Sequence, residues 1–397
     1  MLTRLQSFRI LTALLAGLAA FPNPTQSNPV SFAHPPSLRQ AADHAGILIG
    51  TAVRPSLFSE AAYSATLARE FNMVEPEDAM KWRVIRRNLD SFDFRQADEV
   101  VGFAQVHGMK VRGHCLVWDH DHPDWLAHGH FTPLQLSQLL HDHINRVMKR
   151  YAGQVFAWDV VNEAMDETGR MRDSIWYNQP GIGFAGQGTA YIEQAFRWAR
   201  EADPHALLFY NDAEGEFLNH KSDAIYEMLK DFKHRGVPID GVGLELHLPG
   251  PDLDSAALAA NIARLTALGL QVHITELDVP LPASPSLDSA ARPLHDHDLH
   301  DNSLRGNDLR DNDLHQNDPH DHDLLRQAQV YRSVVHACLQ NPACTAIQTW
   351  GFTDKYSWIS SHSHNTRGHA LWFDQTYQPK PAYDAVLQEL TASRRAK

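Results

Sequence analysis

The sequence lacks three features that would each place it in another class of protein. It has no excess of basic residues, because its formal net charge is -13, and this excludes nucleic acid as an expected partner. It has no apolar run long enough to form a stable membrane span. It also has no glycine-rich turn after an early strand, which argues against a doubly wound nucleotide-binding sheet.

The N-terminus is typical of a secretory signal. Arg4 and Arg9 precede an apolar run of twelve residues, 10–21, and a proline then ends any helix. We therefore predict a signal peptide over residues 1–27 and a leader over 28–45. The mature protein is expected to be secreted or periplasmic, without a membrane attachment after cleavage; an uncleaved anchor is the alternative.

The three cysteines divide into a close pair and a single residue. Cys338 and Cys344 bracket a turn-like LQNPA segment, so in an oxidising compartment we expect a disulfide between them. Cys115 lies in the apolar run HCLVW, and we expect a buried, inert thiol there.

Eight short apolar runs alternate with segments whose apolar residues recur at helical spacing. Gly108, Gly236 and Gly269 follow three of the helical segments as stop signals. Strands separated by helices run parallel, so the pattern predicts an α/β protein, a (β/α)8 barrel forming a single catalytic domain over residues 46–392. The runs cover residues 47–52, 71–74, 110–118, 156–162, 206–212, 241–248, 270–279 and 345–352.

One segment breaks this alternation. Residues 294–323 form six pentads led by Leu or Pro, with nine Asp, two Arg and six His among them. We interpret the segment as a solvated, low-complexity insertion after the seventh strand. A weak metal-binding tract is the alternative.

Two glutamates stand where an apolar run meets the loop that follows it. Glu163 follows the fourth run and Glu276 lies near the end of the seventh. In a (β/α)8 barrel the carboxyl ends of the strands gather at one end, where catalytic groups lie. A buried, unpaired carboxylate is costly, so each glutamate needs an ion pair, a cap or a chemical role. Two carboxyl groups at one end predict glycosidic cleavage, in which one protonates the leaving oxygen and the other attacks or activates water.

The other strand ends carry aromatic and hydrogen-bonding side chains. Sugars present apolar faces and many hydroxyls, so this mixture is expected to line a carbohydrate cleft. The candidates are Glu77, Asp78, Lys81, Trp82, His114, Trp118, Asn211, Asp212, Glu245, His247, Trp350 and Trp358.

Eight blocks between about Gly46 and Leu390 read FNMVEPEDAMKW, FDFRQAD, VRGHCLVW, WDVVNEA, VPIDGVGLELH, HITELDV, TWGFTDKYSW and YQPKPAY. In this order they resemble glycoside hydrolase family 10, the (β/α)8 endo-xylanases. The resemblance implies endo-acting hydrolysis of the β-1,4-xylosidic bonds of xylan with retention of configuration. We expect no cofactor and no metal, and the protein is expected to be a monomer.

The resemblance also implies a role for each matching position. Glu163 in WDVVNE would be the acid/base, and Glu276 in ITELD would be the nucleophile. His247 would orient Glu276, and Asn162 would hold the 2-hydroxyl of the sugar being cleaved. The other positions implied to bind substrate are Glu77, Asp78, Lys81, His114, Trp118, Glu245, Trp350 and Trp358.

Four positions depart from the family pattern. Asp78, Asp119 and Glu245 stand where the family usually has Asn, His and Gln, and Ala213 stands where it has an aromatic residue. The added carboxylates are expected to repel glucuronate-decorated xylan. One alternative is therefore the same chemistry on another neutral β-glycan or on short xylo-oligosaccharides. Another is a non-catalytic carbohydrate-binding protein.

Overall fold

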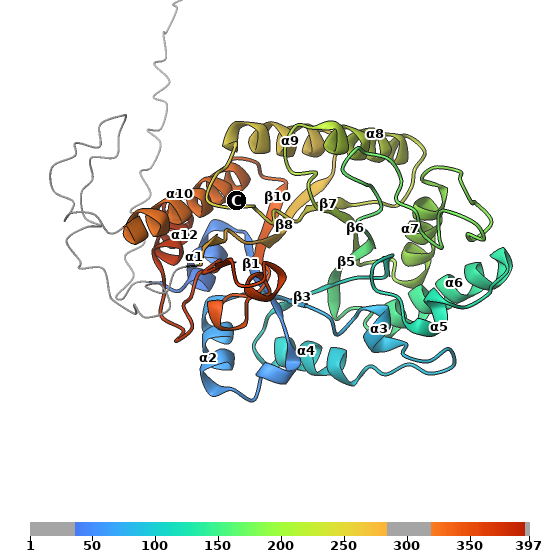
Figure 1. Ribbon diagram of the computed structural model, residues 1–397, viewed down its shortest axis with the longest axis horizontal. Coiled ribbons are helices and arrows are strands. Elements are labelled where there is room, and N and C mark those ends of the chain that lie inside the picture. Colours follow the sequence, from blue (N-terminus) through green and yellow to red (C-terminus); the bar gives the residue numbers. More distant parts are fainter. Residues whose placement is uncertain (1–35, 284–318, 394–397) are drawn as a thin grey trace, which may run out of the picture. The chain divides into compact units, whose positions relative to one another are not determined.

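Eight parallel strands close into a ring, which confirms the predicted (β/α)8 barrel (Figure 1). The computed structural model describes residues 36–283 and 319–393. Each barrel strand pairs with the next along the ring, β1 pairs with β10, and a β3–β5 pairing completes the closure. The strands are β1 (Leu48–Val53), β2 (Met73–Pro76), β3 (Lys110–Gly113), β5 (Val155–Asn162), β6 (Leu207–Asp212), β7 (Gly241–Leu244), β8 (Gln271–Leu277) and β10 (Cys344–Thr349).

Three short strands lie at the margin of the barrel. β4 (Val117–Trp118) pairs with the end of β5, so it continues the line of β3. β9 (Leu281–Pro282) and β11 (Arg367–Gly368) form a separate antiparallel pair. All three lie in segments that leave or approach strand ends, so they shape the loops around the site rather than the barrel wall.

The barrel strands are buried on both faces. Every residue of β2 and β7 is buried, and so are six of the seven residues of β8. One face fills the barrel interior and the other packs against the surrounding helices, as in other parallel barrels. Any charged side chain on the inner face must therefore find its partner inside the barrel.

The long helices lie outside the ring of strands (Figure 1). They are α1 (Leu38–Ala45), α2 (Ala61–Glu70), α4 (Arg95–Val106), α6 (Pro133–Arg150), α7 (Ala190–Ala202), α8 (His220–His234), α9 (Ser255–Ala267), α10 (Pro319–Leu339) and α12 (Pro381–Ala392). Short helical turns are α3 (Trp82–Ile85), α5 (Asp124–Ala127), α11 (Ile359–His362), η1 (Pro55–Leu57) and η2 (Asp354–Tyr356).

The helix ends follow from local sequence. Thr132 and Asn219 each accept a hydrogen bond from the third residue beyond, which caps α6 and α8. Gly108, Gly236 and Gly269 adopt φ of +61°, +67° and +76° just after α4, α8 and α9. This left-handed conformation suits glycine, so the three predicted stop signals are confirmed.

Helix α1 lies within the stretch that the sequence assigns to a leader, yet it belongs to the barrel domain. Leu38 and Ala42 are fully buried. The Leu38 amide donates to Glu70 Oε2 at 2.9 Å, and the Tyr383 hydroxyl donates to the same oxygen at 3.0 Å. The packed unit therefore begins before residue 46, because the apolar face of α1 closes the gap between α2 and α12.

The predicted disulfide is present between Cys338 and Cys344, whose Cα atoms lie 5.2 Å apart. Cys115 is a free, buried thiol, and burial raises its pKa well above its usual range. The predicted signal peptide and residues 294–318 of the pentad segment lie outside the described residues. None of the described helices combines the length and the apolar character that a membrane span requires.

Leu38→Ala is expected to lower the free energy of unfolding by about 2–5 kcal/mol, because it opens a cavity under α1. Urea denaturation of the purified protein measures this change. Leu134→Ala is the matched control, since Leu134 is 67% exposed at the start of α6. Equal stability of Leu38→Ala and the parent protein would show that α1 is not part of the cooperative unit.

Candidate active site

The two predicted carboxylates lie at the carboxyl ends of their strands. Glu163 follows β5 directly, with φ of +50°, and its backbone N–H donates to the Asn211 carbonyl at 3.0 Å. Glu276 is the penultimate residue of β8 and is 4% exposed. The left-handed backbone at Glu163 is unusual for a non-glycine residue. It is fixed by the neighbouring strand β6, which supplies the carbonyl.

Glu276 is held by hydrogen bonds to both of its carboxylate oxygens. Asn211 Nδ2 donates to Oε1 at 2.9 Å, and His247 Nε2 lies 3.2 Å from Oε2. Burial acts to raise the pKa of Glu276, but the His247 hydrogen bond and the charges of His114, His247 and Lys81 outweigh it and lower the pKa. The carboxylate is therefore ionised and fixed in orientation, as a nucleophile requires.

His247 connects Glu276 to a second carboxylate. Its Nδ1 lies 2.8 Å from Asp278 Oδ2, and the same oxygen accepts a hydrogen bond from Trp358 Nε1 at 2.8 Å. Burial alone would lower the pKa of His247, but Asp278 and Glu276 raise it well above its usual range. The imidazolium thus donates from both nitrogens, and Trp358 fixes the outer end of the chain of contacts.

Glu163 is more open than Glu276, with its side chain 18% exposed. Asn162 Nδ2 donates to Glu163 Oε1 at 3.2 Å, and His120 Nδ1 lies 3.7 Å from Glu163 Oε2. Asn162 is itself held by Asn211, which donates to its Oδ1 at 2.8 Å. One buried amide therefore links the side chains at the ends of β5 and β8.

Glu245 is a third carboxyl group beside this pair. It is 2% exposed, and its Oε1 lies 3.0 Å from the same Asn211 Nδ2. Burial, together with the charges of Glu276 and Glu163, raises its pKa well above its usual range. Burial therefore favours the neutral form of Glu245, which faces Asn211.

Aromatic side chains wall the site around Lys81. Its Nζ lies 4.6 Å from the centroid of the Trp118 ring and 5.4 Å from that of Trp350. The Trp350 ring also stands edge-on to His114 at 5.3 Å, and the Trp358 ring stands edge-on to His247 at 5.0 Å. These rings and donors come from four strand ends and face one end of the barrel, as the sequence predicts for a carbohydrate cleft.

Comparison with known proteins identifies the family. The profile of glycosyl hydrolase family 10 matches residues 37–389. The endo-1,4-beta-xylanase B of Thermotoga neapolitana is 37% identical over 354 residues, which cover 88% of this chain and 90% of that protein. Native xylanase 10B from Thermotoga maritima superposes with a TM-score of 0.77 at 38% identity, covering 89% of this chain and 98% of that one.

The chain belongs to glycosyl hydrolase family 10. A further similar structure is xylanase 10B from Thermotoga petrophila RKU-1 in complex with xylobiose, with a TM-score of 0.77 and 38% identity over 91% of this chain and 98% of that one. Family membership covers the barrel domain almost from end to end, so the resemblance seen in the eight sequence blocks is confirmed.

Two of the predicted substrate-binding residues are held in ion pairs in this family 10 barrel. Glu77 forms a two-point ion pair with Arg54, with both distances 2.7 Å. Asp78 is about half exposed and pairs with Lys81 at 3.2 Å and with Arg83 at 3.6 Å. Both carboxylates are therefore engaged by cations, and Asp78 lies beside Lys81.

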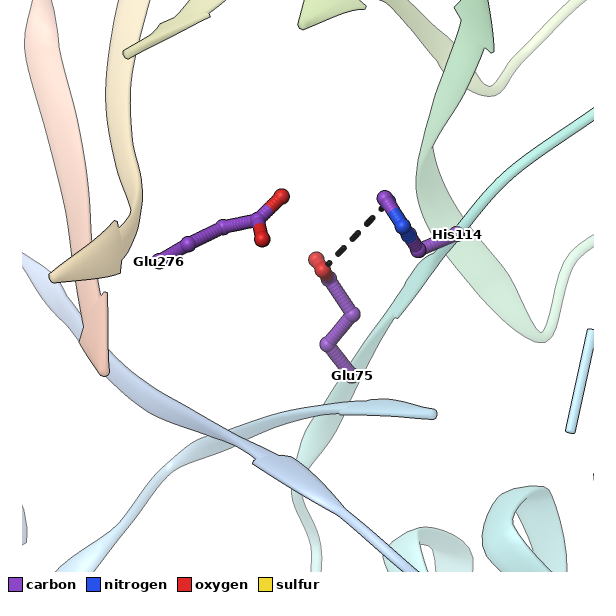
Figure 2. Close-up of side chains that lie close together, drawn as sticks. All are labelled: Glu75, His114 and Glu276. Atoms are coloured by element: carbon purple, nitrogen blue, oxygen red, sulfur yellow. Dashed lines mark ion pairs between the residues drawn. The ribbon is translucent and has the colours of Figure 1, made fainter. Parts of the chain in front are cut away.

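A layer of charge that was not predicted from the sequence lies inside the barrel beneath the site. Arg112 on β3 is fully buried and donates to Asp159 on β5 and to Glu75 on β2. His114 Nδ1 lies 3.1 Å from Asp159 Oδ2. Figure 2 shows Glu75, His114 and Glu276 converging. The signals for this layer were charged residues in or next to apolar runs: Glu75 directly after the run 71–74, Arg112 within the run 110–118 and Asp159 within the run 156–162.

Two groups of side chains in the described part of the chain lie close enough to hold a cation, with ligand atoms within 4.8 Å of one another. They are Glu75, His114 and Glu276, and Glu245, His247 and Glu276. Glu75 is already paired with Arg112 and Glu276 with His247. We therefore assign both groups to the hydrolytic site and not to a metal centre.

His247→Ala is expected to move the acid limb of the kcat/KM profile for hydrolysis to higher pH by about one unit or more. The limb reports ionisation of the nucleophile, and this change removes a hydrogen bond and a positive charge that lower the pKa of Glu276. His141→Ala, an exposed change on α6, is the control. An acid limb that does not move would show that His247 does not control the ionisation of Glu276.

Proposed function

We propose that the protein is an endo-1,4-beta-xylanase that hydrolyses β-1,4-xylosidic bonds by double displacement, with Glu276 as nucleophile and Glu163 as acid/base. The observation that carries the proposal is the pairing of a buried, ionised Glu276 with the more open Glu163 across Asn211. Such an unequal pair supplies the two roles that retaining cleavage needs. The family and the names of its similar members support xylan as the substrate.

In the first step Glu276 attacks the anomeric carbon while Glu163 protonates the departing glycosidic oxygen. In the second step Glu163 deprotonates a water molecule, which attacks the same carbon and releases Glu276. Asn162 lies beside Glu163 and would hold the 2-hydroxyl of the sugar being cleaved. His247 keeps Glu276 aimed and charged throughout.

The side chains that wall the site support the proposed set of sugar-binding residues. Lys81, His114, Trp118, Trp350 and Trp358 would line the sugar site, with the Trp350 ring beside both Lys81 and His114. Glu77 and Asp78 would meet the next sugar on the Lys81 side. Glu245 would act through Asn211, since its side chain is buried and bonded there.

The proposal extends to the setting of the reaction. The signal-like N-terminus supports export to the cell exterior or the periplasm, where a polysaccharide is met. The Cys338–Cys344 disulfide suits an oxidising compartment. We infer that the protein works there as a monomer, because one barrel supplies Glu163, Glu276 and the side chains that hold them.

The test is a product profile on linear xylan, glucuronoxylan and β-1,4-glucan, followed by proton NMR of the first product. We expect internal cleavage of linear xylan, release of the β-anomer, and a loss of roughly 10⁴-fold in kcat for Glu276→Gln. Glu163→Gln should regain turnover with azide on a substrate with a good leaving group, because azide needs no base.

Glu227→Gln, an exposed change on α8, is the control for this series. Full turnover by Glu276→Gln, or first release of the α-anomer, would contradict the assignment. Binding of xylan without release of reducing sugar would favour the non-catalytic alternative. Faster cleavage of β-1,4-glucan than of xylan would keep the mechanism and change the substrate.

A further inference from the structure

The double displacement leaves one buried carboxyl group without a task. Glu75 is fully buried on the inner face of β2. Its Oε2 accepts a hydrogen bond from Arg112 Nη1 at 3.0 Å. Its Oε1 has no hydrogen-bond partner among the described residues, and lies 3.7 Å from His114 Nδ1. An unsatisfied oxygen at this depth costs stability unless something occupies the space in front of it.

The charges around Glu75 do not balance if every carboxyl group is ionised. The groups that face it are Arg112 from β3, His114, which directly follows β3, Asp159 from β5 and Glu276 from β8. Three carboxylates would then share only two cations, the Arg112 guanidinium and His114, whose pKa is raised by its hydrogen bond with Asp159 and the charges of Glu75 and Glu276, in a space closed to solvent. Carboxylates this close together repel one another, so one of the three keeps its proton.

Contacts decide which carboxyl group keeps the proton. Asp159 receives two hydrogen bonds from Arg112 and lies against His114. Glu276 receives hydrogen bonds from Asn211 and His247. Glu75 receives only one, from Arg112. Because hydrogen bonds to a carboxylate favour its charged form, Glu75 is the group least able to stay ionised. Burial raises the pKa of Glu75 to about 7, against the opposing effects of Arg112 and His114.

We propose that Glu75 is a positioning residue for the nucleophile, which stays a neutral carboxylic acid while Glu276 is ionised and donates a hydrogen bond from Oε1 into the space between itself, His114 and Glu276. This inference rests on the proposed function, because it assigns the role of nucleophile to Glu276. Because Glu75 is neutral, the positive charge of Arg112 balances the negative charge of Asp159. Glu276 then remains the ionised carboxylate that faces the anomeric carbon.

Three side chains converge in front of Oε1 (Figure 2). Ligand atoms of Glu75, His114 and Glu276 lie within 4.8 Å of one another, and Figure 2 shows the three side chains pointing into the same space. Two hydrogen bonds of ordinary length, about 2.8 Å each, span this width through one oxygen atom. A water molecule or a sugar hydroxyl placed there would accept the hydrogen bond from Glu75.

Infrared difference spectroscopy tests the protonation state without substrate. Between mildly acid and alkaline solution, the parent protein should lose a carbonyl band of a buried carboxylic acid that is absent from Glu75→Gln. Glu245→Gln is the matched control, because it removes a different buried acid and should leave the Glu75 band in place. Where Glu75→Gln does not fold, Glu75→Asp should shift the same band. A spectrum of Glu75→Gln identical to that of the parent would overturn the proposal.

The pH profile of kcat/KM tests the consequence for the reaction. Glutamine keeps a neutral donor at every pH, so Glu75→Gln should leave the acid limb in place and move the alkaline limb upward by about one unit. An ionised, purely structural Glu75 predicts the opposite, since its removal would lower the pKa of Glu276 and shift the acid limb downward. That shift, or an alkaline limb left in place, would overturn the proposal.

Failure of the proposed function would give a different combination of results from failure of the role proposed for Glu75. If Glu276→Gln retained full turnover, the assignment of the nucleophile would fall even with the Glu75 infrared band present. If Glu276→Gln were inactive and no Glu75 band were found, the proposed function would stand and the role of Glu75 would fall.

Discussion

Glu276 is buried in the mouth of the barrel. It remains charged because Asn211 donates a hydrogen bond to one of its oxygens and His247 donates to the other. A carboxylate in such a place would otherwise take up a proton and lose its nucleophilicity. Most of the site can be understood as meeting this constraint. Asp278 keeps His247 charged, Trp358 fixes Asp278, and Asn211 ties Glu276 to Asn162 and so to Glu163.

The barrel makes these contacts possible because each strand contributes one or two side chains to a common end. β5 supplies Asn162 and β6 supplies Asn211, which are paired in register. β8 supplies Glu276 beside His247, which follows β7. The inner layer of Arg112, Asp159 and Glu75 lies on β3, β5 and β2, inside the barrel. The fold thus places a compensated charge layer beneath the reacting one.

Much of this arrangement was predictable from local sequence. Eight apolar runs matched the eight barrel strands, and glycines at 108, 236 and 269 ended helices as expected. Glu163 and Glu276 stood out because each ends an apolar run, and strand ends meet in a barrel. The pairing of Cys338 with Cys344 was also predictable, since the two residues bracket a turn.

The contacts that could not be predicted from the sequence join segments that are far apart along the chain. Glu75 precedes Glu77 by two residues, and only the position of Arg112, 37 residues away, distinguishes an interior carboxyl group from one at the rim. Helix α1 lies in a stretch without strand-like runs. Its packing depends on Glu70, whose Oε2 accepts hydrogen bonds from the Leu38 amide and the Tyr383 hydroxyl. Asn211 shared in three contacts that no spacing along the chain reveals.

The most direct test of the account is to trap the covalent intermediate. A xylobioside with fluorine at C2 and an activated leaving group reacts quickly with the nucleophile but slowly with water. Mass spectrometry of the intact protein and of its peptides should then show one added xylobiosyl group, carried by Glu276. A label on any other residue, or none under conditions in which the leaving group is released, would contradict the role given to Glu276.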